Sequence, residues 1–405
     1  MPGTAVAVNT VSAEQLESVF GCEHIKQLTE KLKQMPAPTI SYLTDIHFSP
    51  GAIGLLKDVL EEKGLQRPLL VTDTGIVAAG LTERLPVPMA AVFAETGANP
   101  SVEDVEKAGQ LFAQQNCDCV VALGGGSPMD CAKAVSLMAT HDGPLEQYAL
   151  IRGGLSKISG DKPPVIAIPT TSGTGSEVGR AALITFNPTT KLAIVGKPMI
   201  PDVAICDPDL TLQLPALLTA ATGMDAISHC IETFCSPQFN PVADSIALDG
   251  LRRAISQLRA AVDDGTNQEA RSEMMMASMQ GALAFQKGLG MIHSLSHPLG
   301  AIPKRLHHGT LNSIFLPHVL RFNAASCPQA MERMAAVVGC TAGELPDWFH
   351  KLALDIGLPD NLSVLGLERQ DLAPLAEAAF ADHSTATNPA PLTADDCAAM
   401  YSAAL

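Results

Sequence analysis

Five short apolar runs fill the first half of the chain and limit the folds that it can adopt. Each is bounded by glycine, proline or aspartate; they are RPLLVTD (67–73), PMAAVFAE (88–95), CVVALGGG (119–126), PPVIAIPTT (163–171) and DVAICDP (202–208). Such runs are typical of parallel strands that are buried on both faces. The segment VEDVEKAGQLFAQQ (102–115) lies between two of them and has apolar residues at helical spacing. Strands that alternate with helices predict an open α/β sheet.

The rest of the chain predicts further divisions. AALITFNPTTKLAIVG (181–196) has two strand-like arms around Asn-Pro, which indicates an antiparallel hairpin. After Pro215 only helical patterns follow. We therefore predict an N-terminal extension over 1–38, an α/β domain over 39–214 and an all-helical domain over 215–405. Within the extension, SAEQLESVF (12–20) starts with the capping-box pair Ser12 and Gln15 and predicts a helix. That helix either packs on the protein or docks a second subunit.

Composition narrows the partners and the compartment. The formal net charge of −16 opposes binding to nucleic acid or to an anionic membrane. No apolar run reaches the ~20 residues that span a bilayer. The first residues lack the basic start and apolar core of a secretion signal, so we expect a cytoplasmic protein. The 10 cysteines follow no framework spacing, and we interpret them as small, reduced, mostly buried side chains.

Two glycine-rich or hydroxyl-rich loops follow predicted strands and are candidates for binding phosphate. The first, GGGSPMDCAKAV (124–135), opens a helix whose free N–H groups would favour negative charge. The second is IPTTSGTGSEV (168–178). Both would lie at the carboxyl edge of one sheet, where dinucleotides bind. The candidate residues are Gly124, Gly125, Gly126, Ser127, Thr170, Thr171, Ser172 and Thr174. A bare tight turn is the alternative for the first loop.

Two acidic residues in this half have either a functional or a purely structural interpretation. Asp73 ends the first run, where a carboxylate can bind the ribose 2′-hydroxyl and favour NAD over NADP, or can cap the following helix. The sequence leaves both roles open. Asp130 lies in the first turn of the helix after the glycines and is interpreted as a complement to the helix dipole, not as a catalytic group.

Histidines in the second half are spaced for metal binding. Asp225 and His229 in GMDAISHCIE are four residues apart, which places them on one face of a helix. His293 and His297 in HSLSH repeat this spacing, and a histidine pair follows in HHG. A single helical histidine is usually a core or surface residue. Several such placements in one helical domain instead predict a site with one carboxylate and three imidazoles.

The chain resembles the iron-dependent (group III) alcohol dehydrogenases. The matching motifs are GGGSPMDCAK, IPTTSGTGSEV, GMDAISHCIE and the segment from Gly290 to His318, and LLVTD and GANPSVEDV match more weakly. The resemblance covers roughly residues 40–400. It implies a dehydroquinate synthase-like fold with a dinucleotide-binding domain, a helical domain and a divalent metal between them. It also implies NAD, Fe(II) with zinc as the runner-up, a homodimer or larger oligomer, and cofactor-binding roles for Asn99 and Lys191.

The same resemblance implies roles for the histidines. Asp225, His229 and His293 match metal ligands, and His297 matches a histidine near the substrate that is suited to proton relay. The last ligand is either His307 or His308. Counting forward from His297 gives His307, whereas counting back from GTLNSIFLPH gives His308. Because insertions belong in loops and not at helix starts, we predict His308. His318 is interpreted as structural.

These observations lead to one principal function and three alternatives. We expect an NAD(H)-dependent, metal-dependent alcohol dehydrogenase that interconverts a small primary alcohol, such as ethanol, propanol or butanol, and its aldehyde. In that chemistry the cation lowers the pKa of the hydroxyl and the nicotinamide takes the hydride. The alternatives are a glycerol dehydrogenase-like or dehydroquinate synthase-like enzyme, a metal-dependent hydrolase or lyase, and a non-catalytic scaffold.

Overall fold

Six parallel strands form the sheet that the apolar runs predict. They are β1 (Asp45–Phe48), β2 (Pro68–Val71), β3 (Ala91–Phe93), β4 (Cys119–Gly124), β5 (Val165–Pro169) and β8 (Val203–Cys206). Their order across the sheet is β1-β8-β5-β4-β2-β3, and every pairing is parallel. Each predicted run contains one strand. The sequence analysis missed β1, an edge strand whose residues DIHF are partly exposed and carry no apolar run.

The computed structural model describes residues 42, 44–187, 190–302 and 306–405. Residues 1–41 are a separate unit, so the helix predicted within residues 12–20 lies outside the described residues. Residues 42–405 make up the other unit, which contains the sheet and the helices that follow it. In the described part of the chain, no helix combines the length and the apolar character needed to cross a membrane.

The four inner strands, β2, β4, β5 and β8, are covered on both faces, which explains why they are buried throughout. Successive side chains of a strand point to opposite faces. Leu69 and Val71 therefore join the core formed with α5 (Val102–Gln114) and α6 (Gly126–Met138), whereas Leu70 joins the core formed with α3 (Leu56–Glu62). A capping box between Ser101 and Asp104 fixes the start of α5, the helix predicted over 102–115.

The predicted hairpin is confirmed as β6 (Ala181–Asn187) paired antiparallel with β7 (Thr190–Val195). It forms a separate two-stranded sheet. Ala182, Ile184 and Ile194 pack into the core beside α5 and α6, so the hairpin is anchored to the main sheet by apolar contacts. This anchoring gives the hairpin a defined position beside α5 and α6.

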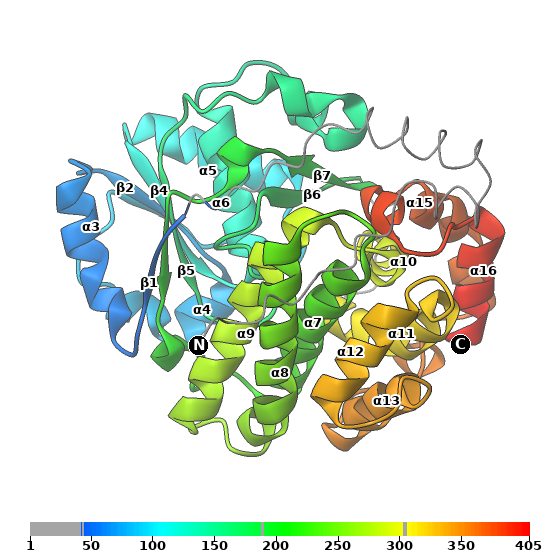
Figure 1. Cartoon of the computed structure of the whole chain (residues 1–405). Coiled ribbons are helices and arrows are strands. Elements are labelled where there is room, and N and C mark those ends of the chain that lie inside the picture. The colour runs from blue at the N-terminus through cyan, green and yellow to red at the C-terminus, as the bar shows by residue number, and fades with distance from the viewer. Residues whose placement is uncertain (1–41, 43, 188–189, 303–305) are drawn as a thin grey trace, which may run out of the picture. The chain divides into compact units, whose positions relative to one another are not determined.

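Helices make up the chain after β8, as the sequence predicts. They are α7 (Ala216–Cys235), α8 (Pro241–Asp263), α9 (Gln268–Ala284), α10 (Met291–Leu299), α11 (His308–Asn323), α12 (Pro328–Val338), α13 (Leu345–Asp355), α14 (Arg369–Leu372), α15 (Ala376–Phe380) and α16 (Ala394–Ala403). Helices α7, α8 and α9 run side by side (Figure 1). Met275 and Met279 of α9 contact Ala204 and Cys206 of β8 in a small apolar cluster. Because this cluster joins the helices to the sheet, the boundary at residue 214 remains a prediction.

The cysteines agree with their interpretation as small apolar side chains. Nine cysteines of the described residues have free thiols, and seven of these are buried. Cys206 and Cys230, for example, belong to apolar clusters. These thiols contribute to packing in the same way as alanine or valine.

A buried lysine connects α6 to the loop after β5. The Nζ atom of Lys133 donates to Ser176 Oγ (2.7 Å), the Gly179 carbonyl (3.0 Å) and the Ala181 carbonyl (2.8 Å). Ser176 Oγ in turn donates to Asp130 Oδ1 (2.7 Å), and Asp130 Oδ2 accepts from the Leu183 N–H (3.0 Å). Asp130 therefore braces this loop. It is the fifth residue of α6, and the first turn of this helix has no acidic residue.

Replacing Lys133 by methionine should lower the free energy of unfolding by about 2–4 kcal/mol, because two buried carbonyls lose a charged donor. Lys162→Met is the matched control. That lysine is also largely buried, but its Nζ makes looser contacts with Asp202 (3.9 Å) and Ser136 (3.4 Å). Urea unfolding of both variants measures the difference. Equal losses for the two would show that Lys133 does not brace the loop.

Candidate metal and cofactor site

Helix α7 supplies the carboxylate at the centre of the candidate metal site. Asp225, His229 and Glu232 are spaced at i, i+4 and i+7, so they share one face of the helix. All three side chains are buried. A buried helix face with three ionisable groups is costly unless those groups have partners. Their partners come from α10 and α11.

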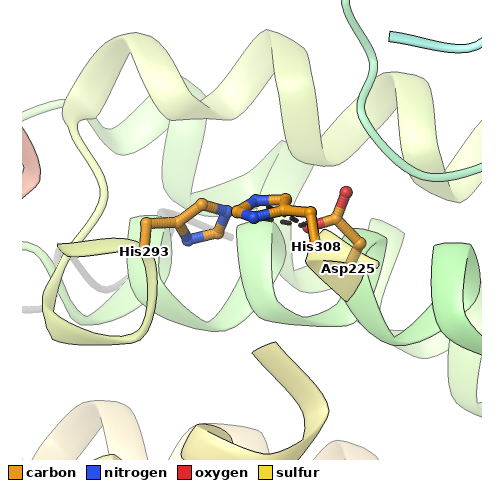
Figure 2. A group of neighbouring side chains, drawn as sticks. All are labelled: Asp225, His293 and His308. Atoms are coloured by element: carbon orange, nitrogen blue, oxygen red, sulfur yellow. Dashed lines mark ion pairs between the residues drawn. The ribbon is translucent and has the colours of Figure 1, made fainter. Parts of the chain in front are cut away.

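Asp225 Oδ1 is the point on which the imidazoles converge. It lies 3.6 Å from His308 Nε2, 3.7 Å from His293 Nε2 and 3.8 Å from His229 Nε2. Figure 2 shows His293 and His308 turned toward the Asp225 carboxylate. Ligand atoms at the corners of a tetrahedron with bonds of ~2.1 Å are about 3.4 Å apart, close to these separations.

The four predicted ligands are not equally close to one another. One ligand atom each from Asp225, His293 and His308 lie within 4.8 Å of one another. His229 stands outside that set, although its ring stacks on His293 with 4.7 Å between centroids. His307 is exposed at the N-cap of α11, whereas His308 is the first residue of the helix. The structure therefore brings His308, and not His307, to the cluster.

A glycine allows α11 to begin close to α7. A Cβ atom at Gly309 would lie 2.0 Å from the Ala221 carbonyl oxygen, a distance that no real side chain tolerates. Without a side chain here, the first turn of α11 can pack against the backbone of α7. This contact places His308 beside Asp225.

The ionisation states of Asp225, His229 and His308 suit a cation. Burial alone would raise the pKa of Asp225, but the imidazoles of His229 and His308 outweigh burial and hold it below its usual value. Burial lowers the pKa of His229 to about 4 and that of His308 well below the usual value. At neutral pH these groups are an anion and two neutral imidazoles, which are the forms that bind metal.

Glu232 is a functional candidate that the sequence analysis missed. Its Oε1 atom accepts from the Ile292 N–H (2.6 Å), and Oε2 makes a short contact with His293 Nδ1. Burial would lower the pKa of His293, but Glu232 and Asp225 raise it to about 9. A carboxylate on Nδ1 fixes the ring so that Nε2 faces the site. The i+7 spacing from Asp225 was the available signal.

Asn312 is a second residue that was missed. Its Nδ2 atom lies 2.7 Å from Asp225 Oδ1, 3.2 Å from His308 Nε2 and 3.3 Å from His293 Nε2. It is one turn after His308 on α11, which was its only signal in the sequence.

The donor set around this point is one carboxylate and imidazoles without a thiolate, which accepts Fe(II) or Zn(II). The residues present therefore fit a divalent cation.

His297 lies beside this cluster and contacts a group of its own. Its ring is 5.5 Å from the His308 ring, and its Nδ1 is 2.9 Å from Asp382 Oδ2. Burial lowers the pKa of His297, although Asp382 opposes this shift. No local pattern in the sequence marks Asp382, because it follows His297 by 85 residues.

The two predicted phosphate loops meet at the carboxyl end of the sheet. A Cβ atom at Gly126 would lie 2.7 Å from Thr174, and one at Gly125 would lie 3.3 Å from Thr171. Gly124 has φ +150°, a conformation that favours glycine, and a Cβ there would meet Pro128. The two loops thus form a cradle, and side chains at the three glycine positions would fill the space inside it.

Hydroxyl groups and N–H groups of the cradle are available to a ligand. No side chain caps the N-terminus of helix α6, so no side-chain oxygen accepts from the first N–H groups of the helix. Thr170 Oγ1 and Ser172 Oγ are buried without a hydrogen-bond partner among the residues described. Ser127 Oγ, in contrast, donates to the Ala98 carbonyl (2.6 Å). Buried unpaired donors beside a helix N-terminus fit the phosphates of a dinucleotide.

The remaining cofactor candidates lie at two places. Asp73 caps α4 (Thr74–Ala78) by accepting from the Ile76 N–H at 2.9 Å, so it has the structural role, and its cofactor role stays a prediction. Lys191 of β7 donates to Asn99 Oδ1 at 2.8 Å. Both atoms would lie 3.6 Å from a Cβ at Gly300, just after α10. The hairpin, with Lys191, and the loop between β3 and α5, with Asn99, therefore meet at the end of the helix that bears His293 and His297.

Sequence and structure comparisons identify relatives of this fold and site. Residues 44–208 match the iron-containing alcohol dehydrogenases, and residues 219–405 match the C-terminal part of the Fe-containing alcohol dehydrogenase family. A 4-hydroxybutyrate dehydrogenase of Cupriavidus necator is 48% identical over 371 residues, covering 88% of this chain and 97% of that protein.

Two solved structures share the fold. The crystal structure of a 1,3-propanediol oxidoreductase has a TM-score of 0.84 and 34% identity, covering 91% of this chain and 100% of that one. A sulfoacetaldehyde reductase from Bifidobacterium kashiwanohense in complex with NAD⁺ has a TM-score of 0.83 and 30% identity, covering 91% and 99%. With both halves of the site matched in order along the chain, this protein belongs to the iron-containing alcohol dehydrogenase family.

Proposed function

We propose that this chain is an NAD(H)-dependent and divalent-metal-dependent dehydrogenase of primary alcohols. The observation that carries the proposal is the convergence of Asp225, His293 and His308 on one point, with the phosphate-type cradle in the same compact unit. A hydrolase would have no use for the cradle. A scaffold would have no use for either feature.

The proposed substrate is an ω-hydroxy carboxylate, with 4-hydroxybutyrate as the first candidate. Support comes from the Cupriavidus necator relative, which is 48% identical and named for that activity. Simple short alcohols such as ethanol, propanol and butanol are the second candidates, and 1,3-propanediol is a third, because a relative from Klebsiella pneumoniae is named for that substrate. All of these compounds have a primary hydroxyl group, and they differ at the far end.

We assign the metal to Asp225, His229, His293 and His308, with Fe(II) favoured by the family name and Zn(II) as the runner-up. When bound, the cation would lower the pKa of the substrate hydroxyl, and the nicotinamide would accept the hydride. The cradle residues and Asp73 would bind the cofactor, and Lys191 with Asn99 would hold it near α10. A homo-oligomer and a cytoplasmic location remain predictions.

His297 would act on the substrate proton. It is buried, it lies 5.5 Å from the His308 ring between centroids, and its lowered pKa keeps it neutral at pH 7. A neutral imidazole has one nitrogen that can accept a proton. In this proposal, His297 takes the hydroxyl proton and later releases it to water.

Glu232→Gln should weaken metal binding by about 10–100-fold, because the ring of His293 loses the carboxylate that orients it. Competition with a chromogenic chelator measures the affinity. Glu273→Gln is the matched control, since that carboxylate pairs with Arg253 on the helical part instead. Unchanged metal affinity in Glu232→Gln would contradict the positioning role.

His308→Ala should lose bound metal, whereas His307→Ala should retain it, because, of these two histidines, only His308 has a ring nitrogen beside Asp225. Metal analysis of the two purified variants, prepared in parallel, gives the answer. The sheet should still bind NAD⁺ in both. If His307→Ala lost the metal instead, the assignment of the last ligand would be wrong.

An anaerobic substrate panel followed by NADH absorbance tests the function itself. We expect a higher kcat/KM for 4-hydroxybutyrate than for butanol, a preference for NAD⁺ over NADP⁺, and loss of turnover after chelation that Fe(II) restores. Metal analysis of the same preparation compares Fe(II) with Zn(II). Absence of turnover on every alcohol and aldehyde by metal-loaded protein would reject the proposed function.

A further inference from the structure

Asp382 holds a carboxylate against the buried edge of His297. It is the N-cap of the short 3₁₀ turn His383–Thr387, and its Oδ1 atom accepts from the Ser384 N–H at 2.8 Å. The other oxygen, Oδ2, lies 2.9 Å from His297 Nδ1. The backbone turn therefore fixes the carboxylate in place, and the carboxylate contacts one defined nitrogen of the imidazole.

The charge of Asp382 determines which nitrogen of His297 carries the proton. Its side chain is 12% exposed, and burial would raise its pKa. The imidazoles of His297 and His383 outweigh burial and hold the pKa well below its usual value. An ionised carboxylate only accepts hydrogen bonds, so His297 Nδ1 must donate. In the neutral ring the other nitrogen, Nε2, then has no proton and can accept one.

Two further imidazoles restrict the orientation of the ring. His297 is nearly parallel to His308, with 5.5 Å between centroids and 11° between planes. It is nearly parallel also to His383, with 5.6 Å and 11°. His383 Nδ1 lies 3.4 Å from Asp382 Oδ1, so the same carboxylate links both rings. His297 thus has two nearly parallel neighbouring rings at 5.5–5.6 Å and a carboxylate at its Nδ1 edge.

We propose that Asp382 is a positioning residue that sets the tautomer and orientation of His297, with His383 steadying both. The inference rests on the proposed role of His297 as the group that takes the hydroxyl proton. It adds a reason why Nε2, and not Nδ1, is the accepting nitrogen. It also gives a function to the C-terminal segment around residue 382, which contributes no predicted metal ligand.

Asp382→Asn is the decisive variant. Asparagine is as good an N-cap as aspartate, so the turn should survive. The neutral amide no longer requires Nδ1 of His297 to be the donor, and a wrong tautomer removes the accepting nitrogen. We expect kcat to fall by about 10²-fold or more. The KM for NAD⁺, the metal content and NAD⁺ binding measured by fluorescence should remain close to those of the wild type.

Two variants separate positioning from packing. Asp382→Glu restores a carboxylate and should recover part of the lost kcat. Asp360→Asn is the matched control, because Asp360 also pairs with a histidine, His350, at 2.5 Å, but both side chains are largely exposed. That control should leave kcat unchanged. A kcat for Asp382→Asn within about threefold of the wild type, or a similar loss in Asp360→Asn, would overturn the proposal.

A measurement that needs no turnover distinguishes this proposal from the proposed function. ¹⁵N NMR of histidine-labelled, Zn(II)-loaded protein reports which ring nitrogen of His297 is protonated. We expect protonated Nδ1 in the wild type and a changed tautomer in Asp382→Asn. If the wild type shows this state but oxidises no alcohol, the proposed function fails and the positioning role stands. Protonated Nε2 in the wild type would overturn the positioning role.

Discussion

Three imidazole nitrogens lie 3.6 to 3.8 Å from one carboxylate oxygen, Asp225 Oδ1. The packing of the helices that carry these side chains depends on this contact. Burying that charge is unfavourable unless it is paired. The pairing needs α7, α10 and α11 to meet at one place, so the helical core is built around a polar centre. Glu232 and Asn312 complete the set by contacting the same imidazoles.

The sheet contributes to this centre through two separate connections. One is the cradle, where the Lys133 ammonium braces the loop after β5 against α6. The other is the hairpin, whose Lys191 lies beside Gly300 at the end of α10. The residues proposed to bind cofactor and metal are therefore held in one frame. The proposed hydride transfer would need such a frame, because the two reacting carbons must be held close together.

Much of this could be predicted from the sequence, for definite reasons. Strands buried on both faces carry uninterrupted apolar residues, so β2, β4, β5 and β8 could be predicted. The edge strand β3 is partly exposed but still apolar (AVF) and was also predicted, whereas the edge strand β1, with Asp45 and His47, was not. Asp225 and His293 could be predicted as site residues because each has a histidine four residues later, on the same face of a helix. Asn312 was marked only by its position one turn after His308, because its contact with Asp225 crosses to another helix. Asp382 contacts a residue 85 positions earlier, so no local pattern marked it.

The glycine after His308 has a wider meaning for the protein. Since a Cβ at Gly309 would lie 2.0 Å from the Ala221 carbonyl, any larger residue would force α11 away from α7. The helix would carry its first imidazole with it. Retention of the proposed metal would thus depend on a contact between two backbones, at a position that has no side chain. Comparing ligands alone between relatives would overlook this dependence.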